Sequence, residues 1–446
     1  TNISSGDENV AIGDEALKLN TSGSYNTAVG DEALKANTIG VKNTAIGKNS
    51  LFSNIHGQQN VGIGFEALKS NTTGGYNTAV GVDANRSNTS GQFNTSVGFE
   101  TLETNTSGSY NTALGARALR YNSGSYNTAV GIFSLDANGS GSYNTAVGTN
   151  SLSNNTTGSN NTAHGSHSLY SNTSGSYNTA TGKDSLRFNT TGSSNTAQGY
   201  TALYSNTSGS YNTATGKGSL RSNTTGSNNT AQGYNALNAN TTGAQNTAFG
   251  EAAMTANTTG SNNTAFGRNA LQNVTSGSQN TAIGLGAGST NSQGTGNIFV
   301  GYMAGSQETG SNKLYIDNSS TTTPLIYGDF DTNSVTVNGN LEVTGNFLTD
   351  KVVSSTGQTV MHYEQATGAV HIGQNSMVFY DSAGPIGNGK DIMASSVGKI
   401  QIGKMNTDVT SFVGEVNVPE PTKPTHAVTK LYADSTAARS MARASA

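Results

Sequence analysis

The sequence predicts an all-β chain dominated by a parallel β-solenoid, in which each 17-residue repeat forms one coil. Eighteen copies begin at Asn residues, from Asn9 to Asn297, and their starts lie 17 residues apart except for the 16-residue step from Asn111 to Asn127. Only 33% of the residues are apolar and 57 are Gly, which is typical of low-complexity chains. The strict repeat nevertheless favours an ordered array, because a copy this short must bury its apolar side chains against its neighbours.

Two glycines and two short runs define each copy, whose positions we count from its first Asn. Position 5 is always Gly and position 15 is usually Gly, so the sequence predicts two turns in which Gly supplies a positive φ. The runs Asn-Thr-Ala-Val and Ala-Leu-x-x between them have the length of short strands, which predicts two strands per coil. Eighteen rungs at ~4.8 Å would make a rod of roughly 85 Å.

Positions 9 and 4 differ in how constant they are. Position 9 is Leu in 14 of the 18 copies, and we assign this file of side chains to the core of each chain. Position 4 is apolar in the first nine copies and in the last four. The five copies between them carry polar residues there, namely His164, Thr181, Gln198, Thr215 and Gln232. A buried polar group without a partner costs about 1–3 kcal/mol, so we predict that position 4 faces the axis of an oligomer.

The Asn-Thr-Ala-Val-Gly core, with its Ala-Leu and Asn-Thr-Ser-Gly sequel, resembles the left-handed β-roll head repeats of trimeric autotransporter adhesins. Similar arrays occur in phage tail fibres and related trimeric fibre proteins. The likeness covers residues 9 to about 305, although this repeat is longer than the usual head repeat, and residues 297–346 look like the segment that follows such arrays. The resemblance implies a homotrimer that is extracellular, on a cell surface or a virion fibre.

The chain divides into four predicted parts. Residues 1–305 form the solenoid, 306–350 a transition with a hairpin around Asn338-Gly339, and 351–418 a β-rich domain in which three chains interleave. Residues 419–446 combine a Pro-containing connector with a helix that starts a short trimeric coiled coil. Strands of the third part are predicted at 352–353, 360–363, 370–372, 377–380, 400–402 and 412–413.

Aromatic side chains are the candidate binding residues. One file precedes the first Asn of the repeat and includes Tyr25, Tyr76, Tyr110, Tyr126 and Tyr143, together with Phe93, Tyr177 and Tyr211. This file would either stack on sugars or pack between chains at a corner of the coil, and packing is the favoured interpretation. Tyr200, Tyr204 and Tyr234 lie near variable, outward-facing positions, so we expect them to make exposed contacts.

Composition and spacing argue against several function classes. The net charge of −4 gives no electrostatic footprint for nucleic acid, and no stretch approaches the ~18 apolar residues that membrane insertion requires. Cys is absent and the six His have no ligand spacing, so we expect neither a metal nor another cofactor. Because no pair of acids recurs, we expect no catalytic residues and no enzyme activity, which leaves a solenoid polysaccharide-degrading enzyme as a distant alternative.

Three functions therefore remain open, in this order. The first is a homotrimeric fibre adhesin that binds a cell-surface receptor, a glycan, through repeated weak contacts. The second is a structural filament or spacer with no receptor of its own, and the third is the solenoid enzyme. Residues 178–211 and 212–245 are near copies of each other, which indicates that the array lengthens by whole coils.

Overall fold

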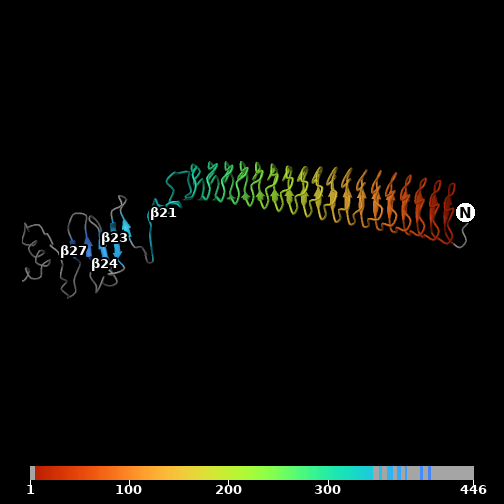
Figure 1. Cartoon of the computed structure of the whole chain (residues 1–446), viewed down its shortest axis with the longest axis horizontal. Coiled ribbons are helices and arrows are strands. Elements are labelled where there is room, and N and C mark those ends of the chain that lie inside the picture. Colours follow the sequence, from red (N-terminus) through yellow and green to blue (C-terminus); the bar gives the residue numbers. More distant parts are fainter. Residues whose placement is uncertain are drawn as a thin grey trace, which may run out of the picture. The chain divides into compact units, whose positions relative to one another are not determined.

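The structure is a computed structural model that describes residues 6–344 and, beyond them, the strand residues 351–353, 359–364, 369–372, 377–378, 392–394 and 400–402. The chain divides into two compact units, Thr1–Leu341 and Glu342–Ala446, which we describe separately. The first unit is a stack of coils, one for each repeat (Figure 1). The predicted all-β parallel solenoid is thus confirmed.

Each copy of the repeat contributes one strand of three residues, at positions 2–4. The strands are β1 (Val10–Ile12), β2 (Thr27–Val29), β3 (Thr44–Ile46), β4 (Val61–Ile63), β5 (Thr78–Val80), β6 (Thr95–Val97), β7 (Thr112–Leu114), β8 (Thr128–Val130), β9 (Thr145–Val147), β10 (Thr162–His164), β11 (Thr179–Thr181), β12 (Thr196–Gln198), β13 (Thr213–Thr215), β14 (Thr230–Gln232), β15 (Thr247–Phe249), β16 (Thr264–Phe266), β17 (Thr281–Ile283) and β18 (Ile298–Val300). Neighbouring strands pair in parallel and in register, so that Ala28 lies beside Ala45. Equivalent positions of successive copies therefore form continuous files along the array.

The prediction of a second strand in each coil is wrong. Positions 6–11 form a run of turns in which positions 7 and 9 have positive φ, for example 58° at Glu32 and 49° at Leu34. The Glu32 N–H donates to Asp14 in the preceding coil, whereas the Leu34 N–H donates to Ser50 in the following coil. This alternation continues the hydrogen bonding between coils without a strand. It also turns the adjacent side chains of Ala33 and Leu34 both into the coil, where each is fully buried.

The two recurrent glycines are required for different reasons. At position 5 the backbone is left-handed, with φ of 135° at Gly30, as predicted. At position 15 φ is not positive, which corrects the prediction for the second turn. A Cβ on Gly40 would instead lie 2.3 Å from Asn37 Oδ1 and 2.5 Å from the Gly57 carbonyl oxygen. Close packing, rather than backbone conformation, therefore excludes a side chain there.

The core is a narrow file of Leu and Ala side chains inside each coil. All 14 Leu residues at position 9 are fully buried, which confirms their assignment to the intrachain core. Near the C-terminal end, position 9 becomes Gly288 and Gly305, and the ring of Phe299 fills the space that two Leu side chains would occupy. A Cβ on Gly305 would lie 2.2 Å from that ring. The large Phe299 side chain thus occupies the core volume that Gly288 and Gly305 leave empty.

Two files of buried Asn side chains line the rest of the interior, at positions 1 and 12. In the second coil, Nδ2 of Asn26 and Nδ2 of Asn37 both donate to the carbonyl oxygen of Gly40, at 2.9 and 3.0 Å. Oδ1 of Asn26 accepts the backbone N–H of Asn43 in the next coil, and Nδ2 of Asn37 donates to Oδ1 of Asn20 in the preceding one. These ladders satisfy the buried amides and bind each coil to its neighbours.

The 16-residue copy keeps this network. Its missing residue falls between positions 12 and 15, so Asn122 Nδ2 reaches Gly124 two residues later instead of three, at 2.8 Å. Asn111 Nδ2 donates to the same Gly124 carbonyl at 3.0 Å. The deletion therefore shortens a corner and leaves the strand register intact.

An antiparallel segment ends the array. Strand β19 (Lys313–Ile316) pairs in parallel with β18, and β20 (Ile326–Asp329) and β21 (Ser334–Val337) add antiparallel to it, completing a sheet of 21 strands. The predicted hairpin around Asn338-Gly339 is wrong, because the chain turns between β20 and β21 instead. Asn338 binds back to the segment before β20, through its N–H to the Leu325 oxygen at 2.9 Å and its Nδ2 to the Pro324 oxygen at 2.6 Å.

The second unit contains two antiparallel three-stranded sheets among its described residues. These are β22 (Lys351–Val353), β23 (Thr359–Glu364) and β24 (Ala369–Ile372), and β25 (Met377–Val378), β26 (Ile392–Ala394) and β27 (Ile400–Ile402). The predicted strands at 352–353, 360–363, 370–372 and 400–402 are confirmed, β25 covers the start of 377–380, and β26 was not predicted. The predicted strand at 412–413, the connector and the C-terminal helix lie outside the described residues.

Candidate functional site

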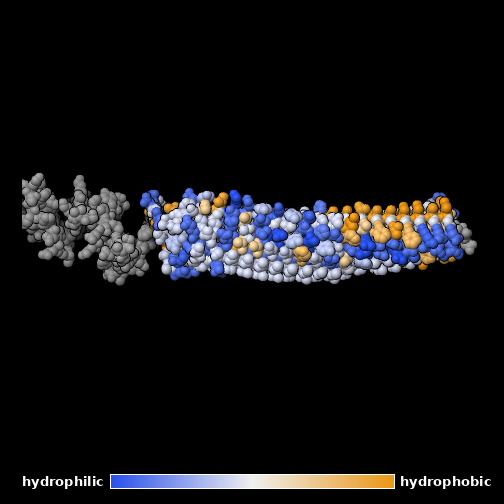
Figure 2. Space-filling model, turned by 90° about the horizontal axis from the view of Figure 1, so that it is seen from above, coloured by the Kyte–Doolittle hydropathy of each residue, from blue (hydrophilic) through white to orange (hydrophobic). Residues whose placement is uncertain are grey.

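Side chains at positions 2 and 4 point away from the core, because successive strand residues alternate between faces and position 3 is buried. In the single chain position 4 is partly or fully exposed, with 60% of Ile12 and 47% of Leu114 accessible. Figure 2 shows hydrophobic residues gathered in lengthwise bands toward the N-terminal end of the array. The apolar part of this file is thus an exposed feature of the isolated chain.

The predicted polar section lies on the same outward file. His164, Thr181, Gln198, Thr215 and Gln232 end the paired strands β10 to β14. The structure therefore brings all five side chains into one continuous row outside the coil, where His164 is exposed and Thr215 is half-buried. Their place at an oligomer axis stays a prediction, since only a partner chain would bury them.

The aromatic file at position 17 contains an unbroken stack of exposed rings. The rings of Tyr76, Phe93, Tyr110, Tyr126 and Tyr143 follow one another with centroids 4.7 to 5.0 Å apart and planes within 10°. Each of these residues has left-handed φ near 60°, which turns the side chain outward. Between 40% and 59% of each side chain is accessible. Ring stacking along the rod was not predicted, yet it follows from the match between coil rise and ring spacing.

The stack limits what its rings can bind. In its interior both faces of a ring are covered by the neighbouring rings, so Tyr110 presents an edge and a hydroxyl rather than a face. Tyr25, Tyr177 and Tyr211 are different, because position 17 of the adjoining coils is not aromatic, so those coils supply no ring to cover their faces. Tyr177 and Tyr211 are each 66% exposed, more than any ring of the stack. They are the better residues for face-on contacts, although the sequence identified them only as members of the file.

The remaining predicted Tyr residues lie in two files beyond the position-5 corner. Tyr200 and Tyr234 occupy position 6 and are half-exposed, with Lys217 Nζ between them at 6.0 and 5.8 Å from the ring centroids. Tyr204 occupies position 10, partly buried, and Arg221 lies 5.5 Å from its ring. All three Tyr rings therefore lie beside a basic side chain, which was not predicted.

Acidic and basic side chains of the N-terminal coils form ion pairs between neighbouring coils. Lys35 bridges Glu32 of its own coil and Glu15 of the preceding one, and Arg86 binds Glu66 at 2.8 Å. The ammonium groups of Lys18 and Lys35 lower the pKa of Glu15 to about 2. Glu15, Glu32 and Glu66 of these coils are therefore each paired with a cation.

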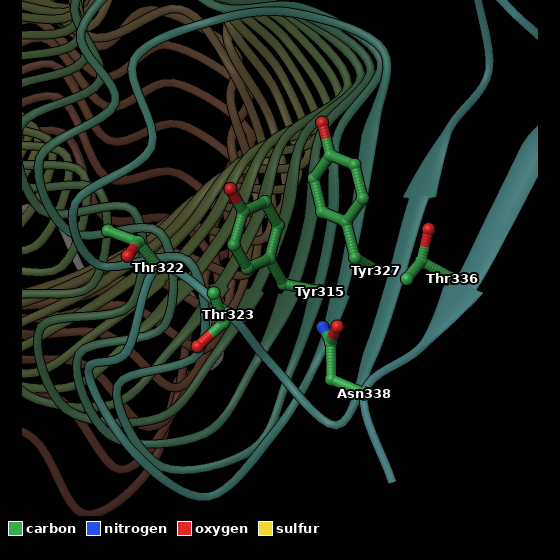
Figure 3. A pocket seen from close by; sticks show the side chains of 6 residues that line it. All are labelled: Tyr315, Thr322, Thr323, Tyr327, Thr336 and Asn338. Atoms are coloured by element: carbon green, nitrogen blue, oxygen red, sulfur yellow. The ribbon is translucent and has the colours of Figure 1, made fainter. Parts of the chain in front are cut away.

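A shallow pocket of about 290 Å³ lies at the end of the array, where β19, β20 and β21 meet. Figure 3 shows the rings of Tyr315 and Tyr327 on one side of it and Thr322 and Thr323 on another. The Tyr315 hydroxyl donates to Glu308 Oε2 at 2.7 Å, and burial followed by this bond raises the pKa of Tyr315. The pocket has no charged lining residue and was not predicted.

Among the described residues, no three His, Asp or Glu side chains cluster as a metal site would require. In the same part of the chain, no helix has the length and apolar character needed to cross a bilayer.

With this geometry established, comparison with known proteins adds no identification. No family model matches the chain, and no curated protein or solved structure is significantly similar to it. The β-solenoid with 17-residue repeats and asparagine ladders is established by the structure itself, whereas the resemblance to trimeric adhesins stays a hypothesis.

Proposed function

We propose that the chain is one of three identical subunits of an extracellular fibre that binds glycans of a cell surface. The observation that carries this proposal is the display of exposed aromatic rings at one corner of a rigid stack of coils. Aromatic side chains are enriched where proteins recognise ligands, and rings with open faces suit the CH groups of sugars. Repetition along the rod allows several weak contacts to act together on one surface.

The homotrimer is supported by the outward file at position 4. Nine successive copies, from Ile12 to Val147, present an apolar residue there, and an exposed apolar band of this kind marks an interaction site. The pattern suits a partner with the same repeat, because its own file would have the same spacing. Sedimentation or light scattering of the purified chain is expected to give three times the monomer mass, and a monomer at micromolar concentration would contradict the trimer.

Glycan-array binding tests the adhesin. We expect the wild-type fibre to bind a defined set of glycans and the double variant Tyr177→Ala/Tyr211→Ala to lose at least about tenfold in affinity, because it loses two open ring faces. The matched control is Tyr110→Ala, which removes a ring whose faces are covered and should bind much more like the wild type. Binding that is absent from the wild type, or unchanged in the double variant, would contradict this proposal.

A spacer without a receptor is the second candidate, and the near identity of residues 178–211 and 212–245 favours it. Duplication of whole coils extends reach without requiring any specific surface. A wild-type fibre that binds no sugar of hosts or bacteria would support the spacer instead of the adhesin.

A further inference from the structure

Four coils in the middle of the array combine basic and aromatic side chains in an alternating order. These coils, residues 178–245, contain four basic side chains and one acidic one, namely Lys183, Arg187, Lys217, Arg221 and Asp184. Elsewhere in the described array, the Lys and Arg side chains other than Lys42 are paired with acids of the same or a nearby coil, as at Lys35, Arg86 and Arg117. This section therefore differs in charge from the coils before it.

Positions 6 and 10 place these side chains coil by coil. In the coil that starts at Asn178 both positions are basic, Lys183 and Arg187, and in the next coil both are aromatic, Tyr200 and Tyr204. The following coil is again basic, with Lys217 and Arg221, and the one after it carries Tyr234 at position 6. Because the files run straight along the array, a cationic coil alternates with an aromatic one.

Three of the four cations have no acidic partner in the described chain. Arg187 binds Asp184 at 2.8 Å, but the equivalent of Asp184 two coils later is Gly218, so Arg221 has no such partner. Lys183 and Lys217 are exposed and make no ion pair with any described residue. The charged groups of Lys217 and Arg221 lie over neighbouring Tyr rings, 5.5 to 6.0 Å from the ring centroids. Their charge is thus available to a ligand.

We infer that these coils bind an acidic polysaccharide in which a carboxylated sugar alternates with a neutral one, with its chain lying along the array. The inference rests on the proposed glycan-binding function and names the ligand class for this section. Cationic coils recur at two-coil intervals, about 9.6 Å, which is close to the length of a disaccharide unit in an extended polysaccharide. A carboxylate then meets Lys183 or Lys217, and the neutral ring between them lies over Tyr200.

Nucleic acid fits the section less well. Double-stranded DNA carries one charge per about 1.7 Å of its axis, whereas the free cations here recur only every second coil. The whole chain also has a net charge of −4, which opposes a polyanion of high charge density. The sparse, regular cations suit one carboxylate per disaccharide.

The test uses hyaluronan oligosaccharides long enough to span four coils, and the same oligosaccharides with their carboxylates converted to methyl esters. We expect the full chain to bind the acidic form, with affinity falling as salt rises, and to bind the neutral ester at least about tenfold more weakly. The variant Lys183→Gln/Lys217→Gln should lose at least about tenfold in affinity for the acidic form. Tyr200→Leu/Tyr234→Leu should weaken binding while leaving the charge unchanged.

The matched control is Lys48→Gln/Arg268→Gln, which makes the same charge change at the same position 6. There each cation is already paired with an acid of the preceding coil, Asp31 or Glu251, so hyaluronan binding should remain close to that of the wild type. Equal affinity for acid and ester, equal loss in both double variants, or tighter Lys183-dependent binding of single-stranded DNA would each overturn the inference. If the inference failed but neutral glycans still bound through Tyr177 and Tyr211, the proposed adhesin function would be retained. The absence of any glycan binding would contradict the adhesin and the acidic-polysaccharide inference alike.

Discussion

The buried Asn at position 12 joins each coil to its neighbour through its side-chain amide. In most coils its Nδ2 donates to the Gly carbonyl of its own coil and to Oδ1 of the preceding Asn. Val274 replaces Asn in one coil, and the ladder is interrupted there. Oδ1 of Asn257 is consequently buried without a hydrogen-bond partner, and the Gly277 carbonyl accepts one Asn side chain, that of Asn263.

We therefore predict that Val274→Asn raises the free energy of unfolding by about 1 kcal/mol, because it supplies donors to two buried acceptors. The matched change in an intact coil, Asn240→Val, should lower it by about 2 kcal/mol, because it removes three side-chain hydrogen bonds and leaves buried groups unpaired. Urea denaturation followed by circular dichroism measures both. A Val274→Asn protein that unfolds at lower urea than the wild type would show that the ladder adds no net stability.

At the scale of the element, the hydrophobic core consists of two clusters that follow one another along the array. The first buried cluster ends at Ala84 and the second begins at Leu102. Asn85 occupies position 9 between them, fully buried, with neither Oδ1 nor Nδ2 hydrogen-bonded. Ser96 and Thr101 replace Ala in the next coil, so the polar break spans two coils.

Asn85→Leu should rejoin the two clusters and raise the free energy of unfolding by about 2 kcal/mol, since it buries apolar surface and removes an unpaired amide. Asn tolerates the left-handed φ of 50° at this position better than Leu does, which reduces the gain. Hydrogen exchange should show slower opening of the coils from β1 to β5 than in the wild type. Faster exchange would mean that the amide is satisfied inside the coil by a group such as water.

At the scale of the array, each coil depends on its neighbours alone, so whole coils should be removable. Deletion of residues 178–211 joins Tyr177 to Asn212 and reproduces the junction that Tyr211 makes with Asn212. We expect a folded array shortened by about 9.6 Å, with nearly unchanged thermal stability. Deletion of residues 178–207 instead breaks the 17-residue register and should unfold the coils around the junction.

Small-angle scattering gives the change in length and calorimetry gives the stability of both deletion proteins. If the two deletions were equally stable, the register of Asn and Leu files would not determine the stacking. If both unfolded, contacts between distant coils would be required, contrary to the nearest-neighbour interpretation.

The sequence by itself determined the coil. A repeat of fixed length, with Leu, Gly and Asn at the same positions of each copy, predicts stacked coils. Only stacking in register buries the Leu side chains and pairs the Asn amides in every copy. It therefore predicted the number of coils, the buried file at position 9 and the positive φ at position 5. It also located the Tyr files at positions 6, 10 and 17 of the repeat, whereas the exposure of each Tyr side chain is a property of the structure.

Only the tertiary structure decided the backbone conformation between the two glycines of each copy. It also decided which side chains lie next to each surface residue. Alternating left-handed residues at positions 7 and 9 let Ala33 and Leu34 face inward together, which strand periodicity forbids. Contacts between neighbouring coils, across 16 or 17 residues, decide whether a Tyr face is covered, as at Tyr110, or exposed, as at Tyr177. These properties depend on which residues stand in neighbouring coils at a given rise, and a single copy of the repeat does not contain that information.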